Sequence, residues 1–132
     1  MSLDDMTGNP YADEARERWG DTPQYQESQR RTATYTGADW DEIRRAGGEI
    51  EQALGAALRA GEPATGDTAT DLAERHRLHI DRWFYPCPPQ THTGLGDMYV
   101  ADARFTAHYE EVAPGLARYL RDAIHANAAR IR

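Results

Sequence analysis

Apolar and small residues recur along this chain at three- and four-residue intervals, which predicts α-helices. The clearest stripe follows Thr36 and Asp39, a pair typical of a capping box at a helix start. One face of the predicted helix then carries Trp40, Ile43, Gly47, Ile50, Leu54, Ala57 and Leu58. Each glycine of the Gly47-Gly48 pair costs a helix roughly 1 kcal/mol relative to alanine. We therefore expect a bend or a close crossing with another helix at this pair.

Two shorter helices are predicted before Thr36. Asn9-Pro10 combines a good N-cap residue with proline in the first turn, and predicts a helix over Tyr11–Trp19. Thr22-Pro23 repeats this arrangement and predicts a second helix through about Arg31. Neither segment has a long apolar face, so each helix is marginal in isolation.

Four more helices are predicted after a linker over residues 61–67, which is rich in Gly, Pro and Thr. The first begins near Thr68 and carries on one face Leu72, His76, Ile80, Trp83 and Phe84. Pro86, Pro88 and Pro89 must end it, because proline lacks the amide donor that continues a helix.

The remaining segments predict a short helix from His92 to Val100 and a second one, capped by Asp102, through Tyr109. Pro114 opens the last predicted helix, whose inward face is Leu116, Tyr119, Leu120, Ala123, Ile124 and Asn127. No alternating pattern is long enough for a strand and no segment repeats. The predicted fold class is all-α.

Composition and charge narrow the functional classes. The 132 residues fit one domain, with 39% hydrophobic and 28% charged residues and a net charge of -7. Residues 1–71 hold 15 acidic and 7 basic side chains, and no arginine cluster forms a basic stripe, so we expect no direct contact with nucleic acid. No apolar run approaches a membrane span, no signal pattern opens the chain, and a single cysteine excludes an internal disulfide. We therefore expect a soluble, cytoplasmic protein with no membrane partner.

Histidine and cysteine side chains raise the question of a metal site. His76 and His79 form an HxxH pair, and Cys87 and His92 follow. A zinc site needs several such ligands that converge on one point, and here the pairs are incomplete. We favour a structural role, with His76 hydrogen-bonded inside the core and His79 at its edge, over the metal alternative. No metal or cofactor is predicted.

Cys87 is also the one candidate nucleophile. It stands between prolines after a helix end, and His92 is near in sequence, but nothing marks this histidine as its base. We favour an inert thiol over a reactive one. No catalytic residue is assigned, and the chain is not expected to be an enzyme.

Several aromatic residues stand where helices are short or loops begin: Trp19, Tyr25, Tyr35, Trp83, Tyr85, Tyr99 and Phe105. Aromatic rings beside weakly helical segments suit an adaptable apolar cleft for a ring-rich ligand. We assign Trp40, Trp83 and Phe105 to the core. Core and ligand roles are equally favoured for Trp19, Tyr25 and Tyr35.

Three stretches together resemble the TipAS antibiotic-binding domain, the C-terminal half of thiostrepton-induced TipA regulators of the MerR class. They are "ARERWGDTPQYQESQRRTATYTGADWDEI", "HRLHIDRWFYPC" and "HTGLGDMYVADARFTAHYEEVAPGLARYLRDAIHANA". The likeness runs from about Tyr11 to Ala128.

The resemblance implies a globin-like helical domain without haem, whose cleft binds thiopeptide or related cyclic peptide antibiotics for sensing or sequestration. It also implies N-terminal helices that are labile without ligand and close over it. We therefore expect a flexible N-terminus at 1–10 and a ligand-binding domain at 11–132. Within that domain, 11–34 is the expected mobile lid and 36–132 the helical core. The chain has no winged-helix segment, so we expect the isolated, drug-sequestering form of the family.

One departure from the family affects the chemistry. The resemblance implies that thiostrepton is attached through a cysteine directly before the "LG-MYV" motif, and this position is Gly94 here. Cys87 corresponds to a second family cysteine that is not the attachment point, so we predict non-covalent binding. The expected ligand-binding residues are Trp19, Tyr25, Tyr35, Tyr85, Cys87, His92, Gly94 and Tyr99. Two alternatives remain: a protein-interaction domain of a MerR-type regulator without a small ligand, and an enzyme that uses Cys87 with His92.

Overall fold

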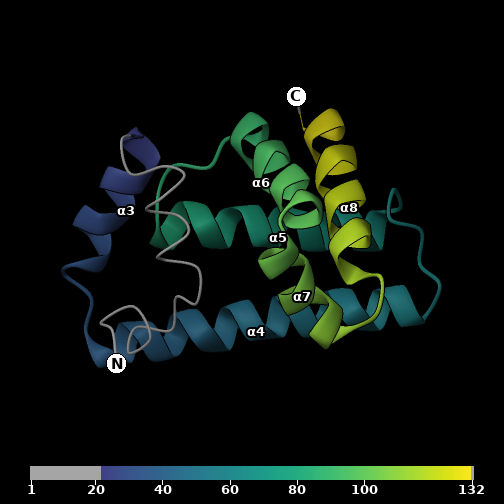
Figure 1. Ribbon diagram of the computed structural model, residues 1–132, viewed down its shortest axis with the longest axis horizontal. Helices are drawn as coiled ribbons and strands as arrows, with labels where there is room; N and C mark the ends of the chain where they lie inside the picture. The colour runs from purple at the N-terminus through teal and green to yellow at the C-terminus, as the bar shows by residue number, and fades with distance from the viewer. Residues whose placement is uncertain (1–21, 132) are drawn as a thin grey trace.

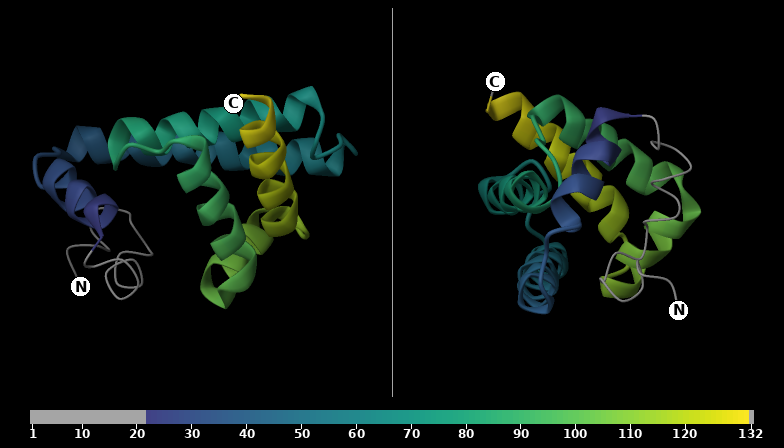
Figure 2. Two further views of the ribbon diagram at one scale, coloured as in Figure 1. Left: turned by 90° about the horizontal axis from the view of Figure 1, so that it is seen from above. Right: turned by 90° about the vertical axis from the view of Figure 1, so that its left-hand side faces the viewer.

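The computed structural model describes residues 22–131, and this range holds six α-helices and no strand (Figure 1). Two long helices, α4 (Gly37–Arg59) and α5 (Asp67–Trp83), run side by side and are seen nearly end-on in the right-hand view of Figure 2. Packed across this pair are α6 (Pro89–Ala101), α7 (Ala103–Val112) and α8 (Leu116–Arg130). The short α3 (Pro23–Thr32) lies at the end of the pair where α4 begins and α5 ends. The all-α prediction is confirmed, and no helix in this range is long and apolar enough to span a bilayer.

Three of the predicted helix starts have the expected N-cap residues. Thr22 Oγ1 accepts the Tyr25 amide at 3.3 Å before α3. At the start of α4 the capping box is complete, since Thr36 Oγ1 accepts the Asp39 amide at 3.2 Å and Asp39 Oδ2 accepts the Thr36 amide at 2.9 Å. At the start of α7, Asp102 Oδ1 accepts the Arg104 amide at 3.0 Å. The helix predicted over Tyr11–Trp19 lies outside the described residues.

Two boundaries differ from the prediction. α6 begins at Pro89 instead of His92, because proline is tolerated in the first turn and the prolines that end α5 also open α6. α8 begins at Leu116 instead of Pro114, because Gly115 adopts a left-handed conformation with φ of 89°. The Glu110 carboxylate then accepts the amides of Gly115 and Ala117 in place of a capping side chain.

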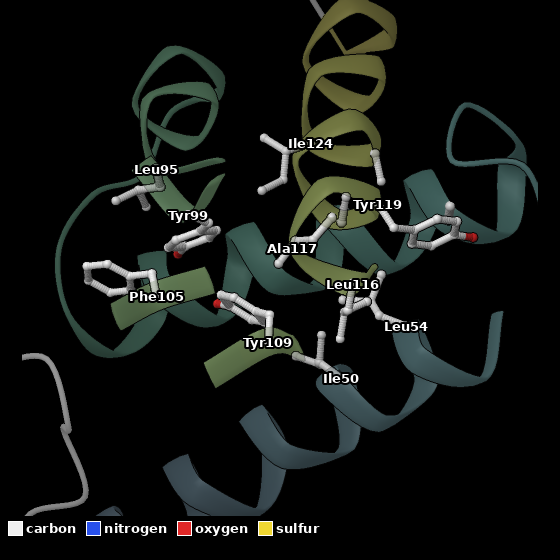
Figure 3. Packing of buried hydrophobic residues seen from close by; sticks show 14 of the residues in the cluster. Ile50, Leu54, Leu95, Tyr99, Phe105, Tyr109, Leu116, Ala117, Tyr119 and Ile124 are labelled. Atoms are coloured by element: carbon white, nitrogen blue, oxygen red, sulfur yellow. The ribbon is translucent and has the colours of Figure 1, made fainter. Parts of the chain in front are cut away.

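The core lies where α4, α5, α6, α7 and α8 converge (Figure 3). Leu54, Leu116, Leu120 and Ile124 are fully buried in it. Trp40 and Phe105 are buried as predicted. The core assignment of Trp83 was wrong: its ring is only half-buried, because α5 ends there beyond the reach of α8, with Arg82 over one face of the ring at 4.6 Å.

The close crossing predicted at the glycine pair is confirmed at Gly47. A Cβ there would lie 3.3 Å from Nε2 of His79, so α4 and α5 approach closely at this point. A Cβ at Gly48 meets no atom within 4 Å.

We expect Gly48→Ala to raise the free energy of unfolding by up to about 1 kcal/mol, because alanine favours the helix and has room here. Gly47→Ala has the same helical advantage but must displace His79, so its gain should be smaller. Urea denaturation of both variants measures the difference. Equal gains would show that the crossing is not tight.

Candidate ligand-binding site

A pocket of about 330 Å³ opens between the start of α3, the turn after α5 and the first turns of α6. Its volume lies at the lower end of the range for small-molecule sites. Two predicted ligand residues, Tyr85 and Gly94, line it. Within the described part of the chain, its lining is completed by Thr22, Gln24, Thr91 and Leu95.

The described pocket wall mixes apolar surface with neutral polar groups and holds no charged side chain. Leu95 and the ring of Tyr85 supply apolar area, and burial raises the pKa of the Tyr85 hydroxyl, so this phenol stays neutral. Hydroxyl and amide groups come from Thr22, Gln24 and Thr91. Such a wall suits an uncharged ligand that combines rings with amide groups.

The turn that carries Tyr85 is tied to the last turns of α5. Asp81 Oδ1 accepts the Cys87 amide at 2.8 Å, and Arg77 Nη1 donates to the Cys87 carbonyl at 2.9 Å. Arg77 is itself oriented by an ion pair with Glu74 at 2.5 Å, and this bond raises the pKa of the guanidinium. Both polar groups of the Cys87 backbone are thus satisfied by α5, which holds Tyr85 at the pocket.

Cys87 does not line the pocket. Its side chain has no exposed surface, and burial raises the pKa of the thiol to about 12, an effect that the nearby Arg77 only partly opposes. The thiol is therefore protonated at neutral pH. This agrees with the prediction of an inert thiol.

His92 and Tyr99 are also buried and not on the pocket wall. Nε2 of His92 lies 2.8 Å from Nδ1 of His76, with the rings stacked at 5.1 Å, and Tyr99 meets His76 edge-on. Burial lowers the pKa of His92 to about 3 and that of His76 well below its usual value, so both rings are neutral at neutral pH. The predicted core role of His76 is confirmed.

The four residues weighed as metal ligands do not converge. Only His76 and His92 meet, whereas His79 lies against Gly47 of α4. Over residues 22–131 no group of three metal-ligating side chains is arranged to hold an ion.

The other aromatic candidates are more scattered. Tyr25 is half-buried on α3, and its hydroxyl accepts a hydrogen bond from Gln29 at 2.6 Å. Tyr35 packs edge-on against Trp40 and Trp83 and donates its hydroxyl proton to the Trp83 carbonyl, so it belongs to the junction of α3 with α5. Trp19 lies outside the described residues.

Sequence reasoning missed four pocket residues: Thr22, Gln24, Thr91 and Leu95. Thr22 was identified only as a helix cap. Neutral polar residues at helix starts, such as Thr22, Gln24 and Thr91, carry no sequence signal of ligand binding, and Leu95 reads as an ordinary core residue. The tertiary structure reveals all four by bringing the start of α3 near α6.

Comparison with known proteins places this arrangement in a family. Residues 11–127 match the TipAS antibiotic-recognition domain. The chain belongs to the TipAS family. This TipAS domain is 47% identical over 126 residues to the HTH-type transcriptional activator TipA of Streptomyces coelicolor, a match that covers 96% of the chain and 50% of that protein. It is 34% identical over 119 residues to the HTH-type transcriptional regulator SkgA of Caulobacter vibrioides, covering 89% of the chain and 44% of the relative. The chain thus spans about half the length of the curated relatives it matches.

Two solved structures share its fold. TipAS of Streptomyces lividans in complex with nosiheptide matches with a TM-score of 0.85 and 45% identity over 95% of this chain and 91% of that one. The antibiotic binding domain of a TipA-class multidrug resistance transcriptional regulator matches with a TM-score of 0.63 and 47% identity over 69% of this chain and 97% of that one. The globin-like helical fold expected for this TipAS domain is confirmed.

Proposed function

We propose that this chain binds thiopeptide-like, ring-rich peptide antibiotics without a covalent bond, in the pocket between α3, the turn after α5 and α6. The observation that carries the proposal is the likeness of this chain, at a TM-score of 0.85, to a TipAS structure solved with the thiopeptide nosiheptide. The uncharged pocket wall of rings, hydroxyls and amides supports the same ligand class.

The role we propose is sensing or sequestration of the antibiotic, and not its chemical conversion. The curated relatives are transcription regulators, and one solved relative is a domain of a multidrug resistance transcriptional regulator. These likenesses support a cytoplasmic protein with a role in antibiotic resistance. Cys87 is buried and protonated, and His92 is paired with His76, so these two residues do not form a nucleophile with its base. The acidic net charge supports the absence of direct nucleic-acid binding by this segment.

Nosiheptide itself tests the proposal. We expect a saturable shift of the unfolding midpoint, since a ligand at one hundred times its Kd stabilises a fold by about 2.7 kcal/mol. Gly94→Trp should abolish the shift, because Gly94 lines the pocket and the indole ring would fill it. The fold should tolerate this substitution, because a Cβ at Gly94 meets no atom within 4 Å. Gly94→Ala is the matched control and should still bind. If the unchanged chain binds no thiopeptide, the protein-interaction alternative is favoured instead.

We also propose that residues 11–34 act as a mobile lid. No residue of α3 is buried, so this helix contributes little apolar area to the free fold. A cyclic peptide with several rings is larger than this pocket of about 330 Å³, and a movement of α3 would widen the pocket.

Hydrogen exchange tests the lid. Without ligand, amides of α3 should exchange faster than those of α8, which buries seven residues. Nosiheptide should increase protection in α3 more than in α8. Equal protection of the two helices in the free chain would contradict a lid.

A further inference from the structure

All three described walls of the pocket are attached to the second half of α5. The turn that contains Tyr85 is held by two hydrogen bonds to the Cys87 backbone, one from Arg77 to its carbonyl and one from its amide to Asp81. α6 is joined to α5 by the bond between His92 and His76. α3, which carries Gln24 and is capped by Thr22, reaches α5 through Arg31, whose Nη1 donates to the Asp81 carbonyl at 2.7 Å.

The attachment of α3 is polar and lies at its C-terminal end. None of its residues is buried, so apolar packing against the described residues contributes little to its position. A second hydrogen bond joins the segment after α3 to α5, because the Tyr35 hydroxyl donates to the Trp83 carbonyl. Glu27, one turn before Arg31, accepts its Nε at 2.7 Å and orients the guanidinium.

The two acceptor carbonyls, those of Asp81 and Trp83, have no hydrogen-bond partner within their own helix. Asp81 and Trp83 are among the last four residues of α5, whose carbonyls have no amide partner within the helix. This end of the helix is also the negative end of its dipole, which favours a cation. Arg31 supplies the cation and Tyr35 a neutral hydroxyl, so α3 caps α5 from outside.

We propose that Arg31 and Tyr35 are positioning residues of the ligand site. They fix the C-terminal end of α3 on α5, and thereby set where Thr22 and Gln24 stand on the pocket wall. The ten residues of α3 form a rod about 15 Å long, so a small rotation at Arg31 displaces the far end by several ångströms. The effect on ligand affinity rests on the proposed function, whereas the docking of α3 does not.

Arg31→Met and Arg30→Met form a matched pair that tests the inference. Both arginines bond to Glu27, but of the two only Arg31 also bonds to α5, through the Asp81 carbonyl. Arg30 is the more exposed side chain, and Arg30→Met leaves the bond to Asp81 in place. In the free chain, Arg31→Met should speed hydrogen exchange in α3 about tenfold and Arg30→Met less than twofold. The Kd for nosiheptide should rise about tenfold in Arg31→Met and stay within twofold in Arg30→Met.

Tyr35→Phe provides a second variant, since it keeps the ring against Trp40 and Trp83 and removes only the hydroxyl. It should change exchange and Kd in the same direction as Arg31→Met. Unchanged α3 exchange in both variants would overturn the inference, as would faster exchange with an unchanged Kd. If the unchanged chain fails to bind nosiheptide, the proposed function fails, and faster α3 exchange in both variants still supports the docking role.

Discussion

We expect thiostrepton to leave the intact mass of this chain unchanged and to add a covalent adduct to Gly94→Cys. A thioether forms when a thiolate adds to the alkene of dehydroalanine and the neighbouring carbon takes up a proton. The single cysteine of the chain does not meet this requirement, because Cys87 is fully buried and its thiol pKa is raised to about 12. The antibiotic should therefore dissociate when the protein is denatured.

A cysteine at position 94 would be exposed to the ligand, whereas Cys87 is not. Gly94 is exposed on the pocket wall, and a Cβ there meets no atom within 4 Å, so a cysteine fits without rearrangement. Mass spectrometry after denaturation should show one adduct on Gly94→Cys, and the same adduct when Cys87→Ala is added. An adduct on the unchanged chain that disappears in Cys87→Ala would contradict this prediction.

Acid should destabilise this fold through its buried histidine pair. His92 and His76 share one hydrogen bond, and burial lowers the pKa of both rings below 6.5. Because the folded pKa lies below the unfolded value, the stabilising effect is complete above about pH 6.5 and is lost as the pH falls towards the folded pKa. From the value of about 3 for His92, protonation of this residue should cost roughly 2 kcal/mol of stability between about pH 6.5 and 4.5.

Other charged and titratable groups also affect how the stability depends on pH. Arg77 and His79 lie near enough to oppose protonation of the pair further. His108, whose pKa is raised by its bond to Glu51, works in the opposite direction, because its contribution is present at low pH and lost as the pH rises. Glu74, whose pKa is lowered chiefly by Arg77, loses its contribution only below about pH 4.5.

Urea denaturation across this window measures the effect. His92→Gln should be less stable at neutral pH but should lose less stability on acidification. His125→Gln is the control, because this exposed histidine pairs with Asp97 on the surface, and its profile should follow that of the unchanged chain. A steep acid loss that persists in His92→Gln would assign it to groups other than His92.

Local sequence signals determined the helices of this protein and their starts. Thr22, Thr36 and Asp102 cap helices where they were expected to, because a cap involves residues only two or three positions apart. The three- and four-residue periodicity of α4 likewise identified residues that are buried in the core. The family likewise followed from short contiguous motifs, and the comparisons confirm it.

The pocket, by contrast, was decided by tertiary structure. Thr22 and Thr91 are far apart in sequence, and they line one pocket because the tertiary fold brings the start of α3 near the first turn of α6. Sequence reasoning placed Cys87 and His92 at the ligand, but the fold turns both side chains into the interior. Helix periodicity assigned Trp83 to the core, yet it is half-buried because burial at a helix end depends on which neighbour reaches it. Hydrophobic pattern and caps act within one helix, whereas a pocket depends on the relative placement of several, which is set by packing and by bonds between distant residues.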